Sequence, residues 1–317
     1  MAAPYLIHIG YQKTGTTWLQ THYFTRREAG FAFTRERKTV PGGIGGLPPG
    51  RYIFQQPLFH YDPPAVRQAV DAFFAADVAA GLRPVISNEQ LAGNPASGGW
   101  QAKEYAWRLA SSFPDALIFM MVREQRTMIR ACYMQYIAAG GGMSLRDFMA
   151  APQDKEAPLP DLYCFRFDNL LRHYRELFPS EQVLCLPYEL FRDRPTEFFN
   201  ALDTFAGATS PARELPVGRR VNSGEGMLQY PVRRVINPLI VRGAVNGRSP
   251  YAITGLQRLA KRGLGVIARQ APRSWDRALV RRWERRIEET TAGFFEESNR
   301  KLGEMIGIDL GQLGWRV

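Results

Sequence analysis

The 317-residue chain has little cysteine and no long apolar run. Its three cysteines, Cys132, Cys164 and Cys185, are widely spaced, which suggests neither a disulfide framework nor a zinc site. We interpret them as small buried apolar residues. No window approaches about eighteen uncharged apolar residues, so we expect no transmembrane helix. Residues 1–4 contain no basic side chain and run straight into an apolar segment, so we expect no signal peptide and a cytoplasmic location.

The positive charge is confined to one region. Apolar residues make up 45% of the chain, enough for a sizeable core, and the net charge is +11. Residues 233–286 hold fourteen lysines and arginines but only two acids, Asp276 and Glu284, so this segment carries +12 and the rest of the chain −1. Apolar and basic residues alternate there at roughly helical spacing. Two interpretations stay open: a helical region packing on the core, and a surface that binds an anionic membrane or an acidic glycan.

Short apolar segments alternate with amphipathic ones. We predict strands at 5–9, 84–86, 116–122 and 183–186, helices at 16–27, 65–80, 100–113, 167–178 and 195–205, a further helix ending near 138, and a Gly/Pro-rich loop at 39–64. This order predicts an α/β fold, a P-loop-like three-layer arrangement with a central parallel sheet flanked by helices. We expect 1–224 to form this core and 225–317 a basic helical C-terminal region packing on it, within one domain.

Four polar side chains come directly after predicted strands. They are Lys13, Glu89, Arg123 and Tyr188. In parallel sheets, ligands bind beyond the carboxyl ends of the strands. We therefore expect these side chains to surround one site.

The segment 10–18 reads Gly-Tyr-Gln-Lys-Thr-Gly-Thr-Thr-Trp and joins a strand to a helix. Its glycines let successive backbone amides face one point, and the helix N-terminus adds to this anion site. Lys13 adds a full positive charge. The nucleotide-triphosphatase loop places its lysine after the second glycine, whereas Lys13 precedes Gly15. A glycine-rich turn without a ligand would not need the lysine and both threonines.

This segment resembles the 5′-phosphosulfate loop of sulfotransferases that use 3′-phosphoadenosine 5′-phosphosulfate (PAPS). The resemblance implies that Lys13 contacts the bridging oxygen and the sulfonate. It further implies that Thr14, Gly15, Thr16 and Thr17 belong to the 5′-phosphate site and that Trp18 packs on the adenine.

A second part of the resemblance follows the strand at 116–122, where Arg123 stands at the position that binds the nucleotide 3′-phosphate. A guanidinium suits a phosphate because it offers bidentate donors. The family's serine eight residues later is replaced by Ala131, with Cys132 beside it. This departure leaves Arg123 as the main candidate, with Arg130 as a compensating one. A surface arginine capping a strand end is the alternative.

Glu89 is the candidate general base. Sulfonate transfer to an alcohol requires the acceptor proton to leave, and a carboxylate facing the loop could take it. The segment Ser-Asn-Glu at 87–89 resembles the element of the glycan-modifying branches. Glu89 could instead cap a local segment or pair with an arginine. Four histidines remain as rivals: His8, expected in the core, His22, His173, and His60 as the reserve candidate.

Three later elements complete the resemblance. Residues 186–190 resemble the family's Y-E-x-L element, whose tyrosine, here Tyr188, lies near the adenine and whose glutamate is structural. Arg220 and Asn222 occupy the place of a loop over the 3′-phosphate. Residues 294–310 resemble the closing helix and tail of bacterial glycan sulfotransferases, which we interpret as architecture.

Together these features predict a PAPS-dependent sulfotransferase of the bacterial, glycan-type branch. It would transfer a sulfonate to a hydroxyl of a saccharide without a metal, releasing 3′-phosphoadenosine 5′-phosphate (PAP). Residues 233–286 could contact the inner face of an anionic membrane, and we expect no nucleic-acid partner. The alternatives are a P-loop kinase-like phosphotransferase and a non-catalytic protein that binds a polyanion or a membrane.

Overall fold

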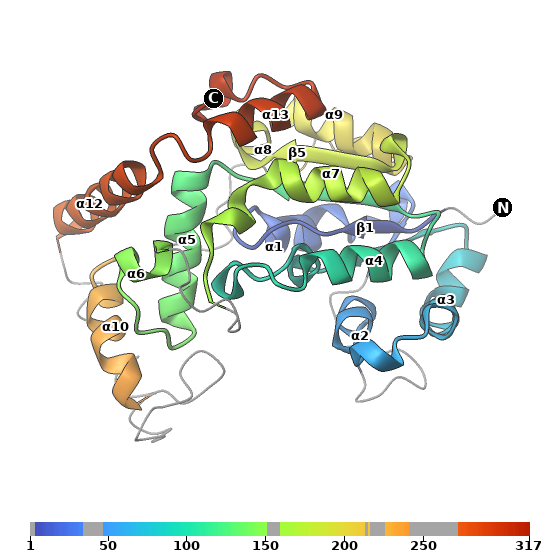
Figure 1. Ribbon diagram of the computed structural model, residues 1–317. Helices are drawn as coiled ribbons and strands as arrows, with labels where there is room; N and C mark the ends of the chain where they lie inside the picture. Colours follow the sequence, from blue (N-terminus) through green and yellow to red (C-terminus); the bar gives the residue numbers. More distant parts are fainter. Residues whose placement is uncertain (1–3, 34–46, 151–158, 213–214, 216–225, 241–271) are drawn as a thin grey trace.

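The computed structural model describes residues 4–33, 47–150, 159–212, 215, 226–240 and 272–317. Five parallel strands form one sheet in the order β2-β3-β1-β4-β5. They are β1 (Leu6–His8), β2 (Phe31–Ala32), β3 (Arg83–Ser87), β4 (Leu117–Val122) and β5 (Val183–Pro187). Helices cover both faces (Figure 1). The predicted parallel α/β fold is confirmed.

At least one α-helix separates each strand from the next, and several more helices follow β5. The α-helices are α1 (Thr16–Trp18), α2 (Pro49–Gln55), α3 (Pro63–Ala79), α4 (Ala102–Ser112), α5 (Gln125–Ala138), α6 (Leu145–Met149), α7 (Phe167–Leu177), α8 (Tyr188–Asp193), α9 (Pro195–Ala206), α10 (Gln229–Ile240), α12 (Arg273–Thr291) and α13 (Glu296–Ile306). A π-helix, η1 (Leu19–Tyr23), continues α1, and short 3₁₀ turns include η3 (Leu58–His60) and η4 (Glu89–Ala92).

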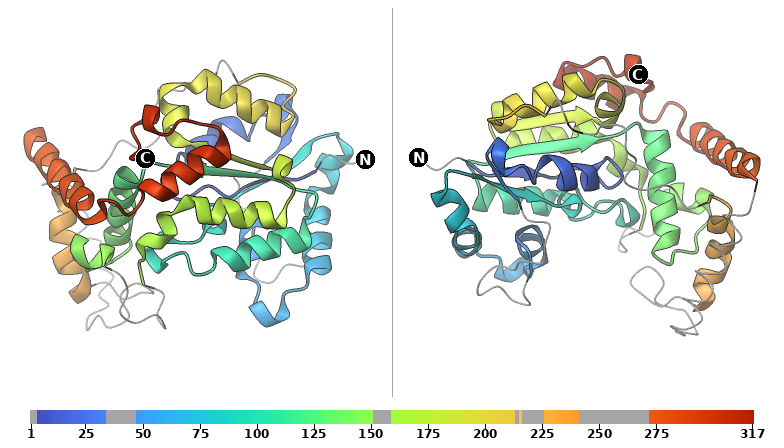
Figure 2. Two further views of the ribbon diagram at one scale, coloured as in Figure 1. Left: turned by 45° about the horizontal axis from the view of Figure 1, so that its top comes forward. Right: turned by 180° about the vertical axis from the view of Figure 1, so that it is seen from behind.

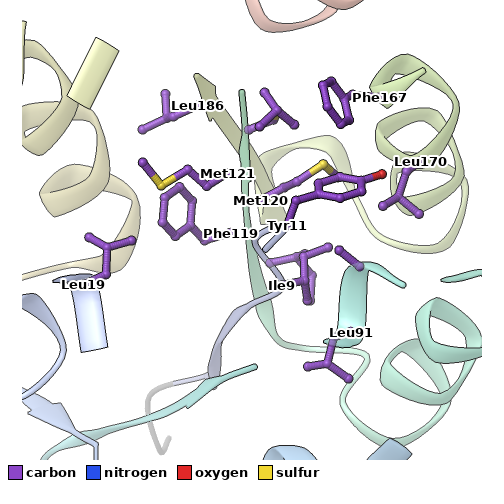
Figure 3. Packing of buried hydrophobic residues seen from close by; sticks show 14 of the residues in the cluster. Ile9, Tyr11, Leu19, Leu91, Phe119, Met120, Met121, Phe167, Leu170 and Leu186 are labelled. Carbon is purple, nitrogen blue, oxygen red and sulfur yellow. The ribbon is translucent and has the colours of Figure 1, made fainter. Parts of the chain in front are cut away.

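The core lies on both faces of the sheet, which is why β4 is apolar at every position. Alternate side chains of a strand point to opposite faces. Phe119 and Met121 point toward the face of Leu19, whereas Met120 points toward Leu170 of α7 (Figure 3). These β4 side chains are fully buried.

The strand order creates a crevice at the carboxyl end of the sheet. From β1 the chain continues to β2 and β3 on one side, whereas β4 continues to β5 on the other. Such a reversal opens a ligand crevice between the two neighbouring strands. Gly10 comes two residues after the end of β1 and Arg123 directly after β4, so both candidate phosphate-binding segments lie here.

Several elements differ from the sequence prediction. The predicted helix 16–27 is divided into α1 and the π-helix η1. The sequence pattern predicts neither β2 nor α8. The helix α2 lies inside the predicted loop 39–64. Buried Arg108 of α4 holds α2 in place, because its Nη1 donates to the Ile53 carbonyl at 2.9 Å. Its guanidinium also lies 4.5 Å from the centre of the Tyr61 ring. The helix therefore depends on a contact distant in sequence.

The described part of the C-terminal region is mostly helical: α10 and α12 pack against α5, and α13 packs against α7. α10 and α12 lie at the same end of the molecule (Figure 2), and each contacts α5. Arg130 of α5 pairs with Glu284 of α12, and Asn237 of α10 donates to the Ile137 carbonyl at 2.8 Å. Among the described helices none is long and apolar enough to cross a bilayer.

Buried Glu189 joins three distant segments. Its Oε1 accepts the backbone N–H of Glu124 at 3.2 Å, and its Oε2 accepts Nε1–H of Trp315 at 3.0 Å. The carboxylate thereby connects the end of β4, the start of α8 and the C-terminal tail. These hydrogen bonds give Glu189, the glutamate of the Y-E-x-L element, a role in holding the fold together.

Replacing Glu189 by alanine is expected to lower the free energy of unfolding by about 2–4 kcal/mol, because two donors lose their partner. Urea unfolding measures this loss. Glu189→Gln keeps an acceptor oxygen and should lose clearly less. Equal losses for the two variants would show that the hydrogen bonds contribute nothing.

Candidate functional site

The loop between β1 and α1 lies at the crevice, and several of its backbone amides lack an acceptor among the described residues. Lys13 has a φ of 67° and Gly15 one of 94°, so both adopt the left-handed conformation. The Thr14 hydroxyl donates to the Tyr11 carbonyl at 2.6 Å and fixes the turn from inside. Among described residues, the amides of Lys13, Gly15, Thr16 and Thr17 find no hydrogen-bond acceptor. Adjacent amides without acceptors suit an anion.

The loop rests on His8, whose imidazole is fully buried between Phe24 and Phe119. Its Nδ1 lies 2.8 Å from the Ser87 hydroxyl. Burial lowers the pKa of His8 to about 3, so the ring stays neutral. His8 is thus a core residue, as expected from the sequence, and it supports the loop and β3.

Gly10 has no room for a side chain, because an added Cβ would lie 2.5 Å from Nε2 of His8. We expect Gly10→Ala to lower the free energy of unfolding by about 1–3 kcal/mol through overpacking. Thermal unfolding of Gly10→Ala, His8→Ala and the double variant checks the cause. If the imidazole is responsible, the double variant loses less than the sum of the single ones. Strictly additive losses would exclude this contact.

Arg123 spans the crevice from the end of β4. Its Nη1 donates to the Lys13 carbonyl at 2.9 Å, and its Nε donates to the Thr127 hydroxyl at 3.1 Å. Burial lowers the pKa of Arg123, as expected for a cation removed from water. Arg123 therefore holds the loop in the conformation that exposes its amides, and it adds positive charge beside them.

Tyr188 closes the other side of the loop. The Arg123 guanidinium lies 4.9 Å from the centre of the Tyr188 ring. The ring lies 3.6 Å from the position of a Cβ added to Gly15, so ring and loop are in contact. The structure therefore brings Lys13, Gly15, Arg123 and Tyr188 together.

Glu89 opens the 3₁₀ turn η4 after β3 and lies within electrostatic range of Lys13. Burial raises the pKa of the Glu89 carboxyl, and the Lys13 ammonium opposes part of this rise. No hydrogen bond or ion pair joins Glu89 to another described side chain. A half-buried carboxyl with a raised pKa beside a cation suits a general base.

Buried Cys132 of α5 also lies at this site; the sequence pointed to it only as the neighbour of Ala131, which stands at the position of the expected serine. Burial raises the pKa of its thiol to about 12, although Lys13 and Arg123 favour the thiolate. Cys132 and Cys185 are buried and Cys164 is half-buried, and all three are free thiols. Arg130, the candidate to compensate for Ala131, pairs with Glu284 of α12.

The side chains of the remaining loop residues, Thr16, Thr17 and Trp18, differ in how far they are buried. Trp18 is 5% exposed and packs on Phe191 and Phe199, so little of its surface is left for a nucleotide. The Thr16 hydroxyl is buried without a partner among described residues, whereas Thr17 is half-buried.

Other candidates lie away from this cluster or outside the described residues. Arg220 and Asn222 fall outside those residues. His60 is exposed on η3, and His173 of α7 approaches Glu176, with 3.3 Å between Nδ1 and Oε2. His22 packs on Trp18.

Two of the cavities in the described part of the chain lie away from Lys13, Glu89 and Arg123, which line neither of them. One of about 390 Å³ lies between α4 and α7 and reaches Tyr11. The other, of about 610 Å³, lies between α5, α6, α10 and α12 and is rich in arginine. No three His, Cys, Asp or Glu side chains gather as a metal site within the described ranges.

No known family model and no curated protein matches this chain. Among solved structures, it is similar to a sulfotransferase from Alicyclobacillus acidocaldarius at 16% identity, with 74% of this chain and 95% of that chain covered and a TM-score of 0.44. It is also similar to the sulfotransferase domain from the curacin biosynthetic pathway at 10% identity, with 98% and 99% covered and a TM-score of 0.46. At these identities and TM-scores, neither structure identifies the family of this chain.

Proposed function

We propose that this protein is a sulfotransferase that moves a sulfonate from PAPS to an acceptor hydroxyl. One observation carries the proposal: at the carboxyl end of β1 and β4, a loop with amides that lack acceptors lies beside Lys13, Arg123 and Glu89. The loop amides suit an anionic donor group, Lys13 supplies a cation for the leaving oxygen, and Glu89 supplies a base for the acceptor proton.

The donor would bind with its 5′-phosphosulfate on the loop. The amides of Gly15, Thr16 and Thr17 would hold the 5′-phosphate, with Thr14 fixing the turn. Arg123 would bind the 3′-phosphate, and Tyr188 would lie near the adenine. The 3′-phosphate roles of Arg220 and Asn222, and the adenine role of Trp18, rest on the sequence resemblance.

The reaction would be an in-line displacement at sulfur. The acceptor oxygen forms the new S–O bond while the bond from sulfur to the bridging phosphate oxygen breaks, and PAP leaves. Lys13 stabilises the negative charge that develops on the bridging oxygen. Glu89 takes the proton of the acceptor hydroxyl. The loop and Arg123 hold the donor in line, which supplies much of the acceleration.

We propose a saccharide as the acceptor. Trp100 and Trp107 are about half exposed near the start of α4 and along it, and Trp107 packs on Tyr61. Exposed aromatic rings can stack on the apolar faces of sugars. This support is independent of the donor site, so a different acceptor would leave the donor proposal intact.

The experiment is to incubate the protein with PAPS and to quantify PAP by anion-exchange chromatography. Parallel reactions contain neutral oligosaccharides, acidic oligosaccharides, a phenol or no acceptor, and a separate one contains ATP with Mg²⁺. We expect PAP release that a saccharide stimulates. Transfer from ATP without turnover of PAPS would instead support the kinase-like alternative.

A further inference from the structure

The helix α10 has an inverted distribution of polar and apolar side chains. Its buried face is mostly polar: Gln229, Arg233 and Asn237 are each less than a tenth exposed, and Tyr230 is the one buried aromatic residue among the described positions of the helix. Arg233 donates to the Ala138 carbonyl and Asn237 to the carbonyls of Ile137 and Gly141, so polar contacts attach α10 to the end of α5. Apart from Tyr230, the side chains that α10 buries are therefore polar ones.

The outward face of α10 is apolar. Val232 is 43% exposed, Val235 61% and Leu239 53%, and their spacing places them on one stripe of the helix. Trp275, at the start of the neighbouring α12, is 62% exposed. Valine and leucine side chains gain free energy when they leave water, so such a stripe indicates a contact surface.

An arginine-lined groove borders this stripe. The cavity of about 610 Å³ between α5, α6, α10 and α12 is lined by Arg234, Arg282, Arg285 and Arg286. Only Arg286 approaches a carboxylate, Glu289, at 4.0 Å; the other three form no ion pair with a described residue. Arg234 directly precedes Val235 on α10, so the groove and the stripe adjoin.

We propose that this face, formed by the α10 stripe and the arginine groove, binds the surface of an anionic phospholipid bilayer. The arginines would take lipid phosphates, while Val232, Val235 and Leu239 would enter the boundary between headgroups and acyl chains. Exposed tryptophan is also typical of this boundary. An acidic polysaccharide would match the arginines but would leave the aliphatic stripe in water, so both features together favour a bilayer.

The test is flotation of the full chain with vesicles of phosphatidylcholine alone or of phosphatidylcholine and phosphatidylglycerol in equal parts. We expect binding to the anionic vesicles only. Removal of one groove arginine, in Arg282→Ser or Arg285→Ser, should weaken partitioning about fivefold. The triple variant Val232→Ser/Val235→Ser/Leu239→Ser should weaken it at least about tenfold. Matched controls are Phe59→Ser, exposed on η3, and Arg300→Ser, exposed on α13.

Three outcomes would overturn the proposal. The first is no binding to anionic vesicles at low salt. The second is binding that the triple variant leaves unchanged while heparin competes it away, which would indicate a polyanion site. The third is a lower melting temperature of the triple variant with unchanged vesicle binding, which would show that the chain itself covers the stripe. None of these outcomes bears on PAPS turnover, so failure here is distinct from failure of the proposed function.

Discussion

Replacing Lys13 by alanine is expected to lower the rate of sulfonate transfer from PAPS about a hundred- to a thousandfold, the effect of removing one group that stabilises developing charge. The Lys13 backbone carbonyl accepts a hydrogen bond from Arg123, and the Lys13 ammonium lies within electrostatic range of Glu89. Because the cation acts mainly on the leaving oxygen, kcat should fall more than the affinity for the donor. Initial rates of PAP release over a range of PAPS concentrations measure both.

The backbone at Lys13 offers a control that separates catalysis from folding. Its φ of 67° is unfavourable for any residue with a Cβ, by about 1 kcal/mol. Lys13→Gly should therefore raise the melting temperature while it lowers the rate at least as much as Lys13→Ala does. Lys103→Ala, an exposed lysine of α4 in the cavity between α4 and α7, serves as the matched control and should stay active. A fully active Lys13→Gly variant would remove the lysine from the mechanism.

Replacing Glu89 by glutamine is expected to lower kcat about a hundred- to ten-thousandfold, because the acceptor proton loses its base. Glutamine keeps the size and a hydrogen-bonding oxygen, so the half-buried position should tolerate it. Affinity for PAP should stay unchanged, because the proposed role of Glu89 is toward the acceptor hydroxyl and not the donor. Calorimetric titration measures the affinity for PAP, and steady-state rates measure kcat, in the wild-type protein and in Glu89→Gln. Loss of PAP binding in Glu89→Gln would assign the residue to the donor site instead.

The pH dependence provides an independent check on Glu89. The base must be ionised, so the rate should rise with pH through the Glu89 pKa. Since burial raises that pKa, the midpoint should lie above that of an ordinary glutamate. Lys13 lowers the pKa, so the residual activity of Lys13→Ala should rise only at still higher pH. An unshifted profile in Lys13→Ala would separate the two groups.

The sequence alone predicts the strands β1, β3, β4 and β5, because each is a short apolar segment followed by polar residues. The apolar segments that precede Lys13, Glu89, Arg123 and Tyr188 are strands, because each is buried on both faces. Parallel strands bring their carboxyl ends together, which is why residues more than a hundred positions apart could be expected at one edge. The contact of Arg123 with the Lys13 carbonyl agrees with that expectation.

Other features depend on contacts that local patterns do not encode. The helix α2 forms within a Gly/Pro-rich segment because buried Arg108 binds its backbone, and an arginine in a helix gives no local signal of that role. Which side of α10 is buried depends on its hydrogen bonds to carbonyls at the end of α5, and the sequence of α10 alone does not indicate these contacts. The two-residue strand β2 is too short for a periodic pattern. Arg130 was a candidate for the anion, and its pairing with Glu284 follows from the packing of α12.

The most direct test of the central claim is calorimetric titration of PAP into the wild-type protein, Lys13→Ala and Arg123→Ala, with ADP as the comparison ligand. The loop beside Arg123 predicts saturable binding of PAP that is tighter than binding of ADP. In Arg123→Ala we expect about ten- to a hundredfold weaker binding of PAP, the effect of losing charge-assisted hydrogen bonds, with the preference over ADP reduced. Equal affinities for PAP and ADP, unaffected by either substitution, would contradict the assignment of this crevice as the donor site.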